Sequence, residues 1–146
     1  MVISHTITGE TRLRLTDRWK PAQNPGKPHL PGFDIRWHFI ILLNDEPAGH
    51  FYVGYRQEGK VIQARLVIAG EKTGWSGETI PFIIGSVSDL LLADGKAAGL
   101  TILQQPVTNY HPEFPGLRES PSDNGPAWFL PIDQKRSARH WDDRPD

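Results

Sequence analysis

The sequence of 146 residues lacks cysteine altogether, which excludes disulfide bonds, cysteine-ligated zinc and thiol catalysis. It also lacks an excess of charge, because 16 Lys and Arg are nearly balanced by 17 Asp and Glu, for a formal net charge of −1. No overall field recruits nucleic acid or a membrane, and we expect neither as a partner. No apolar run approaches about 18 residues and no signal-peptide pattern opens the chain, which predicts a cytoplasmic protein.

The length and the apolar content of 38% predict one domain, residues 1–132, followed by a polar, charged C-terminal tail at 133–146. Residues 2–15 predict two strands or one bulged strand. Prolines crowd the stretches 21–32 and 106–131, which are predicted to be long loops with only a short strand at 127–130. The first loop is either a lid over a site or a plain connection.

Residues 35–68 predict an antiparallel β-meander of three strands, because apolar and polar side chains alternate there with a period of two. Turn-forming residues fill positions 44–49 and Glu58-Gly59. This register places Arg65 opposite Tyr52. One face of the meander is apolar and is predicted to be core: Ile35, Trp37, Phe39, Ile41, Leu43, Phe51, Val53, Tyr55, Ile62, Ala64, Leu66 and Ile68.

The reverse face of this meander carries bases and aromatic rings but no carboxylate. Arginine forks bind carboxylate or phosphate, and rings stack on planar groups, so this face predicts a ligand site. The predicted ligand-binding residues are Arg36, His38, Tyr52, Arg56 and Arg65. The alternative is an ordinary half-wet sheet face, since Ile40, Leu42, Val61 and Val67 also lie on it and require cover.

No metal site is predicted. His38 and His50 share the reverse face, but the predicted register separates them by about 13 Å, too far for joint ligation of one ion. The acidic pairs Asp45-Glu46 and Asp142-Asp143 lie in a turn and in the tail, where we expect solvation instead of acid–base chemistry.

After residue 79 the period changes from two to about 3.6, which predicts a helix that begins near Ser76 or Thr79 and ends at Gly95 or Gly99. Leu100–Gln104 reads as a strand, so residues 61–105 form a β–loop–α–β unit. The predicted fold class is α+β, with an antiparallel sheet of about five strands, one principal helix and long Pro-rich loops.

The stretch 70–77, between the third meander strand and this helix, is a candidate anion-binding loop. Glycines let backbone N–H groups approach an anion, and a helix N-terminus adds partial positive charge. A plain flexible connection is the alternative, because neither a Walker nor a G-x-G-x-x-G spacing is present. The residues of the candidate loop are Lys72, Gly74, Trp75, Ser76 and Gly77.

The order of meander, Gly-rich loop, helix and strand resembles the central part of the GNAT acyltransferase superfamily, over roughly residues 35–105. In that family a Q/R-x-x-G-x-G/A loop before the helix holds the pyrophosphate of acetyl-CoA. The nearest match here is Glu71-x-x-Gly74-x-x-Gly77, which has a different first residue and one residue more. The resemblance implies acetyl-CoA as cofactor, bound by Gly74, Gly77 and the amide region of Ser76, with no assignable base.

Three functional hypotheses follow. The first is a non-enzymatic, cofactor-free binding protein whose reverse face recognises a protein partner or a small anionic ligand. The second is an acyl-CoA-dependent N-acyltransferase. The third is a cofactor-free cyclase or isomerase with an apolar pocket oriented by Tyr52, His38 and Arg65. No catalytic set is complete in the sequence, which leaves open whether the protein is an enzyme.

Overall fold

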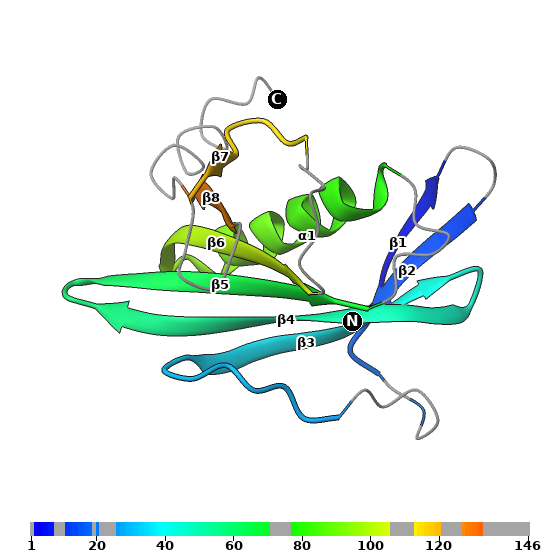
Figure 1. The fold of residues 1–146 in the computed structure, drawn as a ribbon, viewed down its shortest axis with the longest axis horizontal. Helices are drawn as coiled ribbons and strands as arrows, with labels where there is room; N and C mark the ends of the chain where they lie inside the picture. Colours follow the sequence, from blue (N-terminus) through cyan, green and yellow to red (C-terminus); the bar gives the residue numbers. More distant parts are fainter. Residues whose placement is uncertain are drawn as a thin grey trace, which may run out of the picture.

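The computed structural model describes residues 2–7, 11–18, 20, 26–70, 77–105, 113–120 and 127–132. Within these ranges the chain forms one eight-stranded sheet, with the strand order β1-β2-β3-β4-β5-β6-β8-β7, and one helix (Figure 1). The elements are β1 (Val2–Ile7), β2 (Thr11–Thr16), β3 (Asp34–Leu43), β4 (Glu46–Glu58), β5 (Val61–Ala69), α1 (Thr79–Asp94), β6 (Ala97–Gln105), β7 (Arg118–Glu119) and β8 (Ala127–Pro131). The predicted tail at 133–146 lies outside the described residues.

The predicted α+β class is confirmed, but the prediction of about five strands is wrong. Residues 2–15 supply two separate strands, β1 and β2, and the Pro-rich stretch after β6 supplies β7 in addition to the expected β8. β7 consists of Arg118 and Glu119 alone, too short to show an alternating pattern. Short strands near the two edges of the sheet account for the difference.

The strands β3, β4 and β5 form the predicted antiparallel meander, and β5 continues through α1 into the parallel strand β6. α1 covers one face of the sheet, here called the helix face (Figure 1). The core between α1 and the sheet includes Leu15, Phe39, Phe51, Val53, Leu66, Ile68, Ile80, Ile83, Ile84, Val87 and Leu91. At its centre the rings of Phe39 and Phe51 stack with their centroids 5.1 Å apart.

α1 begins at Thr79 and ends at Asp94, followed by Gly95, whose N–H donates to the carbonyl of Leu91 at 3.0 Å. This confirms the predicted end at Gly95. The residue that caps the N-terminus is Glu78, without a side-chain hydrogen bond, so Thr79 lies within the helix. The other predicted cap, Ser76, lies outside the described residues. The described part of the chain has no helix with the length and apolar character needed to cross a membrane.

The predicted register between β4 and β5 is wrong by two residues. The turn is Gly59-Lys60, and Glu58 pairs with Val61, so Arg65 lies opposite Gly54 and not opposite Tyr52. A turn displaced by one residue shifts the pairing by two. An even shift leaves every side chain on its predicted face.

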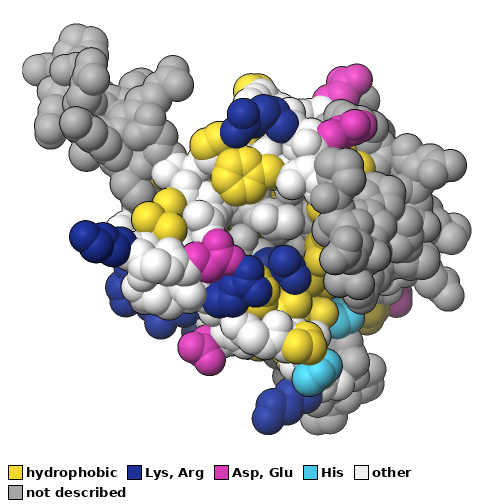
Figure 2. All heavy atoms as spheres, turned by 60° about the vertical axis from the view of Figure 1, so that its left-hand side comes forward, with side chains coloured by type: hydrophobic (Ala, Val, Ile, Leu, Met, Phe, Trp, Pro, Cys, Tyr) yellow, Lys and Arg dark blue, Asp and Glu magenta, His cyan; other side chains and the backbone are white. Residues whose placement is uncertain are grey.

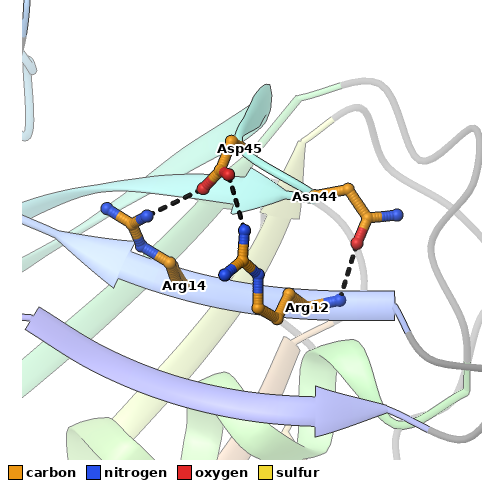
Figure 3. Close-up of polar contacts among 4 residues, drawn as sticks. All are labelled: Arg12, Arg14, Asn44 and Asp45. Carbon is orange, nitrogen blue, oxygen red and sulfur yellow. Dashed lines mark hydrogen bonds and ion pairs between the residues drawn. The ribbon is translucent and has the colours of Figure 1, made fainter.

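The hairpin between β3 and β4 turns at Asn44 and Asp45, which both have positive φ, 49° and 66°. The N–H of Arg12 donates to Asn44 Oδ1 at 2.8 Å (Figure 3). The N–H of Asn44 donates in return to the carbonyl of Arg12 at 2.8 Å. The carboxylate of Asp45 accepts from Arg12 at 2.6 Å and from Arg14 at 2.7 Å. The turn is thereby fastened to β2, and Asp45 has a structural role.

Two bulges interrupt the pairing of β3 with β4. Near the turn, Leu42 pairs with Pro47 and Ile41 with Gly49, so Ala48 is the extra residue. At the other end, Ile35 pairs with Gly54 and Trp37 with Val53, so Arg36 is the extra residue. β2 pairs only with Ile40–Leu43 of β3, which leaves Asp34–Phe39 without a strand on that side among the described residues.

We predict that Gly70→Ala lowers the free energy of unfolding by about 1–3 kcal/mol, because Gly70 has φ +137° and an added Cβ would lie 2.5 Å from Gly49 Cα. The measurement is denaturation in urea. Gly77→Ala is the matched control: nothing lies within 4 Å of its Cβ position, so its effect should stay within about 0.5 kcal/mol. Equal effects of the two variants would contradict this reading.

Candidate functional site

The reverse face, opposite α1, carries four of the five predicted ligand-binding residues: His38, Tyr52, Arg56 and Arg65. Their neighbours Phe39, Phe51, Val53, Ala64 and Leu66 belong to the core on the helix face. Because successive side chains of a strand point to opposite faces, the four residues share the other side of the sheet. Arg65 and Tyr52 therefore point the same way, as the alternation predicts.

The placement of Arg36 on the reverse face is wrong. The bulge at this position turns its side chain to the helix face, where Nη2 lies 3.1 Å from Asp94 Oδ1 at the end of α1. The hydroxyl of Tyr55 donates to the other carboxylate oxygen of Asp94 at 2.7 Å. The same bulge leaves Ile35, a predicted core residue, 38% exposed.

The segment before β3 packs on the reverse face and makes its main contacts at Gly54. A Cβ at Gly54 would lie 2.9 Å from Phe33 Cβ and 3.0 Å from Leu30 Cδ2, so only glycine allows this approach. Tyr52 Oη lies 3.5 Å from the carbonyl of His29, its acceptor. The end of the predicted Pro-rich loop, residues 29–32, and the following Phe33 thus form a cover over part of this face.

Two arginines converge on the ring of Phe33. The guanidinium carbon of Arg56 lies 4.7 Å from the ring centroid, and that of Arg65 lies 4.6 Å from it. Both distances suit cation–π contact, which is strongest where water is partly excluded. We call Phe33, Arg56 and Arg65 the arginine–phenylalanine cluster.

The two arginines of this cluster differ in their charge partners. Arg56 is paired with the carboxylate of Glu58, with Nε 3.0 Å from Oε1. Arg65 has no ion pair among the described residues, and its Nε is buried without a hydrogen-bond partner there. Burial, and then the charge of Arg56, lower the pKa of Arg65 below its usual range, while Glu58 opposes this effect. Within the described part of the chain, the cluster therefore contains one cation without an ion pair of its own.

His38 and His50 contact each other directly, and the predicted separation of about 13 Å is wrong. His38 Nε2 lies 2.8 Å from His50 Nδ1. The reason is the bulge at Ala48, which pairs Ile40 with His50 and makes His38 the diagonal neighbour of His50. A hydrogen bond between two imidazoles needs one N–H and one bare nitrogen, so the pair does not carry two full charges.

The environment of this histidine pair favours the neutral form. Burial, and then the charge of His50, lower the pKa of His38 from 6.5 to about 4. Burial also lowers the pKa of His50. The ring of Tyr52 lies against both imidazoles, with centroid distances of 5.7 Å and 6.1 Å. Tyr52 is only 6% exposed, so its ring forms a wall beside the two imidazoles. Burial also raises the pKa of its hydroxyl, which stays protonated.

The reverse face is more covered than an ordinary half-wet sheet face. Ile40, Leu42 and Val67 are buried, with at most 4% of their surface exposed, whereas Val61 near the turn stays 43% exposed. The part of the face that remains open to a ligand is thus its rim, where the arginine–phenylalanine cluster lies.

The remaining sequence candidate for a site is the predicted anion loop. Lys72, Gly74, Trp75 and Ser76 of the predicted anion loop lie outside the described residues, and Gly77 is exposed just before α1. The described ranges contain no group of three His, Asp or Glu side chains close enough to hold a metal ion.

Sequence reasoning missed Phe33, which the Pro-rich loop brings to the site. The available signal was Gly54, because a glycine inside a strand marks a place where another segment comes close. It also missed Asp94, which holds Arg36 on the other face.

Comparison with known protein families and with curated proteins finds no match to this sequence. The chemistry of the described residues is therefore the basis for a functional proposal.

We predict that the protein loses stability as the pH falls from 6.5 towards 4. The folded state keeps His38 neutral while the unfolded chain takes up a proton near pH 6.5, so acid favours unfolding over this interval. Urea denaturation at several pH values measures the effect. His38→Gln should make the pH dependence shallower, and His29→Gln, a change at an exposed histidine, should leave it unchanged. A slope unaffected by His38→Gln would show that this pair is not responsible.

Proposed function

We propose that this protein is a non-enzymatic binding protein that holds an anionic group of a small ligand or of a protein partner at the arginine–phenylalanine cluster. The observation that carries this proposal is the uncompensated guanidinium of Arg65 beside that of Arg56.

Two cations that share one aromatic ring repel each other, and the charge of Arg56 adds to burial, the larger cause, in lowering the pKa of Arg65. The one carboxylate at the cluster, Glu58, is already paired with Arg56. A bound carboxylate or phosphate would supply the missing negative charge and accept two parallel hydrogen bonds from a guanidinium. The ring of Phe33 adds an apolar surface for a planar group attached to that anion.

Binding is favoured over catalysis by the arrangement of the titratable groups. The imidazoles of His38 and His50 are directed at each other, and Tyr52 is buried with a raised pKa. A general base needs a pKa near the working pH and a clear path to its substrate. A cluster that holds a half-buried cation against an aromatic ring instead suits recognition. A cytoplasmic location belongs to the same proposal and is favoured by the absence of cysteine.

The acyltransferase alternative remains a prediction, with one feature in its favour. The chain passes from β5 through α1 into a parallel β6, and this is the order on which the resemblance rests. Acetyl-CoA therefore belongs among the compounds to be tested. The hypothesis of a cyclase or isomerase also remains a prediction, which no contact described above favours.

We predict that benzoate binds at the cluster and that benzamide, its neutral analogue, does not. Titration followed by two-dimensional NMR should shift the amide signals of Phe33, Gly54 and Arg65. Arg65→Gln should weaken benzoate binding about tenfold, or about 1.4 kcal/mol, because a charge-assisted hydrogen bond is lost.

The matched control is Arg118→Gln, because Arg118 also lies over a ring, that of Phe129 at 5.8 Å, but in β7. It should leave benzoate binding unchanged. Equal binding of benzoate and benzamide would refute the proposal. A rise in Tm with acetyl-CoA that Arg65→Gln does not alter would favour the acyltransferase instead.

A further inference from the structure

A second concave region lies at the end of the sheet where β3 begins, β4 meets β5 and α1 passes into β6. It is an open cavity of about 300 Å³ lined by Asp34, Ile35, Arg36, Tyr55, Gln57, Ile62 and Lys96. Figure 2 turns this end of the molecule forward and shows Lys and Arg side chains spread over it, with Asp and Glu between them. None of these lining residues belongs to the arginine–phenylalanine cluster.

The bulge in β3 builds the cationic wall of this cavity. As the extra residue, Arg36 is turned to the helix face, where Asp94 holds its guanidinium at 3.1 Å. The hydroxyl of Tyr55 fixes the same carboxylate at 2.7 Å, and the rings of Trp37 and Tyr55 lie 5.7 Å and 5.9 Å from the guanidinium carbon. A guanidinium has five N–H donors. Arg36 is thus held in place with donors left for a ligand.

Lys96 supplies a second cation at the cavity. It follows the glycine that ends α1 and forms no hydrogen bond or ion pair with any described residue. The nearby carboxylate of Asp94 accepts from Tyr55 and Arg36, and these bonds, together with the charges of Arg36 and Lys96, keep the pKa of Asp94 low although burial opposes this. Lys96 is thus attracted to Asp94 without forming an ion pair with it, and its ammonium donors can bind an anion from solution.

The charges of the lining set the charge of the ligand. Arg36 and Lys96 face two carboxylates: Asp94, which is bonded to Arg36, and Asp34, which is exposed at the start of β3. Lys96 is then the cation of the lining that has no ion pair among the described residues, and one such cation suits a monoanion and disfavours a dianion such as a phosphate monoester.

The remaining lining is apolar. Ile35 and Ile62 both belong to the lining; Ile62 is half-buried, and Ile35 is 38% exposed overall as a consequence of the bulge. A cavity with an apolar wall and few charged groups is the usual form of a site for a small organic molecule, and about 300 Å³ is at the lower end of that range.

We infer that this cavity binds a small organic monoanion, with its carboxylate between Lys96 and Arg36 and its apolar body against Ile35 and Ile62. Asp94, which lies outside the lining, and Tyr55, which is part of it, are positioning residues, because Asp94 holds Arg36 and Tyr55 fixes Asp94. This site is on the opposite side of the bulged strand from the arginine–phenylalanine cluster and does not depend on the function proposed for that cluster.

The test is a titration with hexanoate, followed by two-dimensional NMR, with hexanol as the uncharged probe. Hexanoate should shift the amide signals of Ile35, Arg36, Ile62 and Lys96, and hexanol should not. Lys96→Gln should weaken hexanoate binding about tenfold through loss of the charge-assisted contact. Lys60→Gln, at an exposed lysine of the β4–β5 turn, is the matched control and should leave binding unchanged.

Testing each variant with the ligand of the other site shows whether the two sites are independent. Arg65→Gln should leave the hexanoate response at the cavity intact, and Lys96→Gln should leave the benzoate response at the cluster intact. The inference is overturned if hexanol and hexanoate shift the same signals equally, if Lys96→Gln binds hexanoate as tightly as the unmodified protein, or if the shifts map only to Phe33 and Arg65.

Discussion

One extra residue in β3, Arg36, determines which cationic side chains of this protein can act together. A strand alternates strictly between its two faces, so an inserted residue exchanges the faces of everything on one side of it. Without the bulge, Arg36 would join Arg56 and Arg65 on the reverse face. With it, Arg36 meets the carboxylate of Asp94, and Ile35 is left at the surface. The positive charge of the sheet is thereby divided between two sites.

The half-buried guanidinium groups of Arg36 and Arg65 have different partners. Asp94 neutralises Arg36, and the hydroxyl of Tyr55 holds that carboxylate in position. Arg65 instead lies against the ring of Phe33, which provides contact but no charge. Removal of a cation from water without a full counter-charge is unfavourable, so Arg65, which has no ion pair among the described residues, costs free energy of folding at this position.

The sequence predicts the central strands and the helix well, because a period of two and a period of 3.6 are strong patterns over nine or more residues. The face of Arg65 was predicted correctly even though its partner was not. Glycine at position 59 fits the turn in either of two alignments, and these differ by an even number of residues.

Other features could not be predicted from alternation. A bulge adds a residue without changing the composition of the strand, so the predicted face of Arg36 and the predicted distance between His38 and His50 were wrong. The path of the Pro-rich segment across the sheet is a long-range contact, and only Gly54 hints at it. Loop 71–76, on which the resemblance to acyltransferases depends, lies outside the described residues.

The half of β3 that β2 does not accompany has a consequence for how molecules of this protein behave when concentrated. The unpaired backbone groups of an edge strand can pair with a strand of another chain, and this pairing can start aggregation. Along Asp34–Phe39 this edge begins with the carboxylate of Asp34, and the bulge at Arg36 interrupts its regular spacing. A strand from another molecule could not form a regular ladder of hydrogen bonds here, and it would meet a charged side chain. The bulge that shapes the cavity therefore also hinders the growth of fibrils.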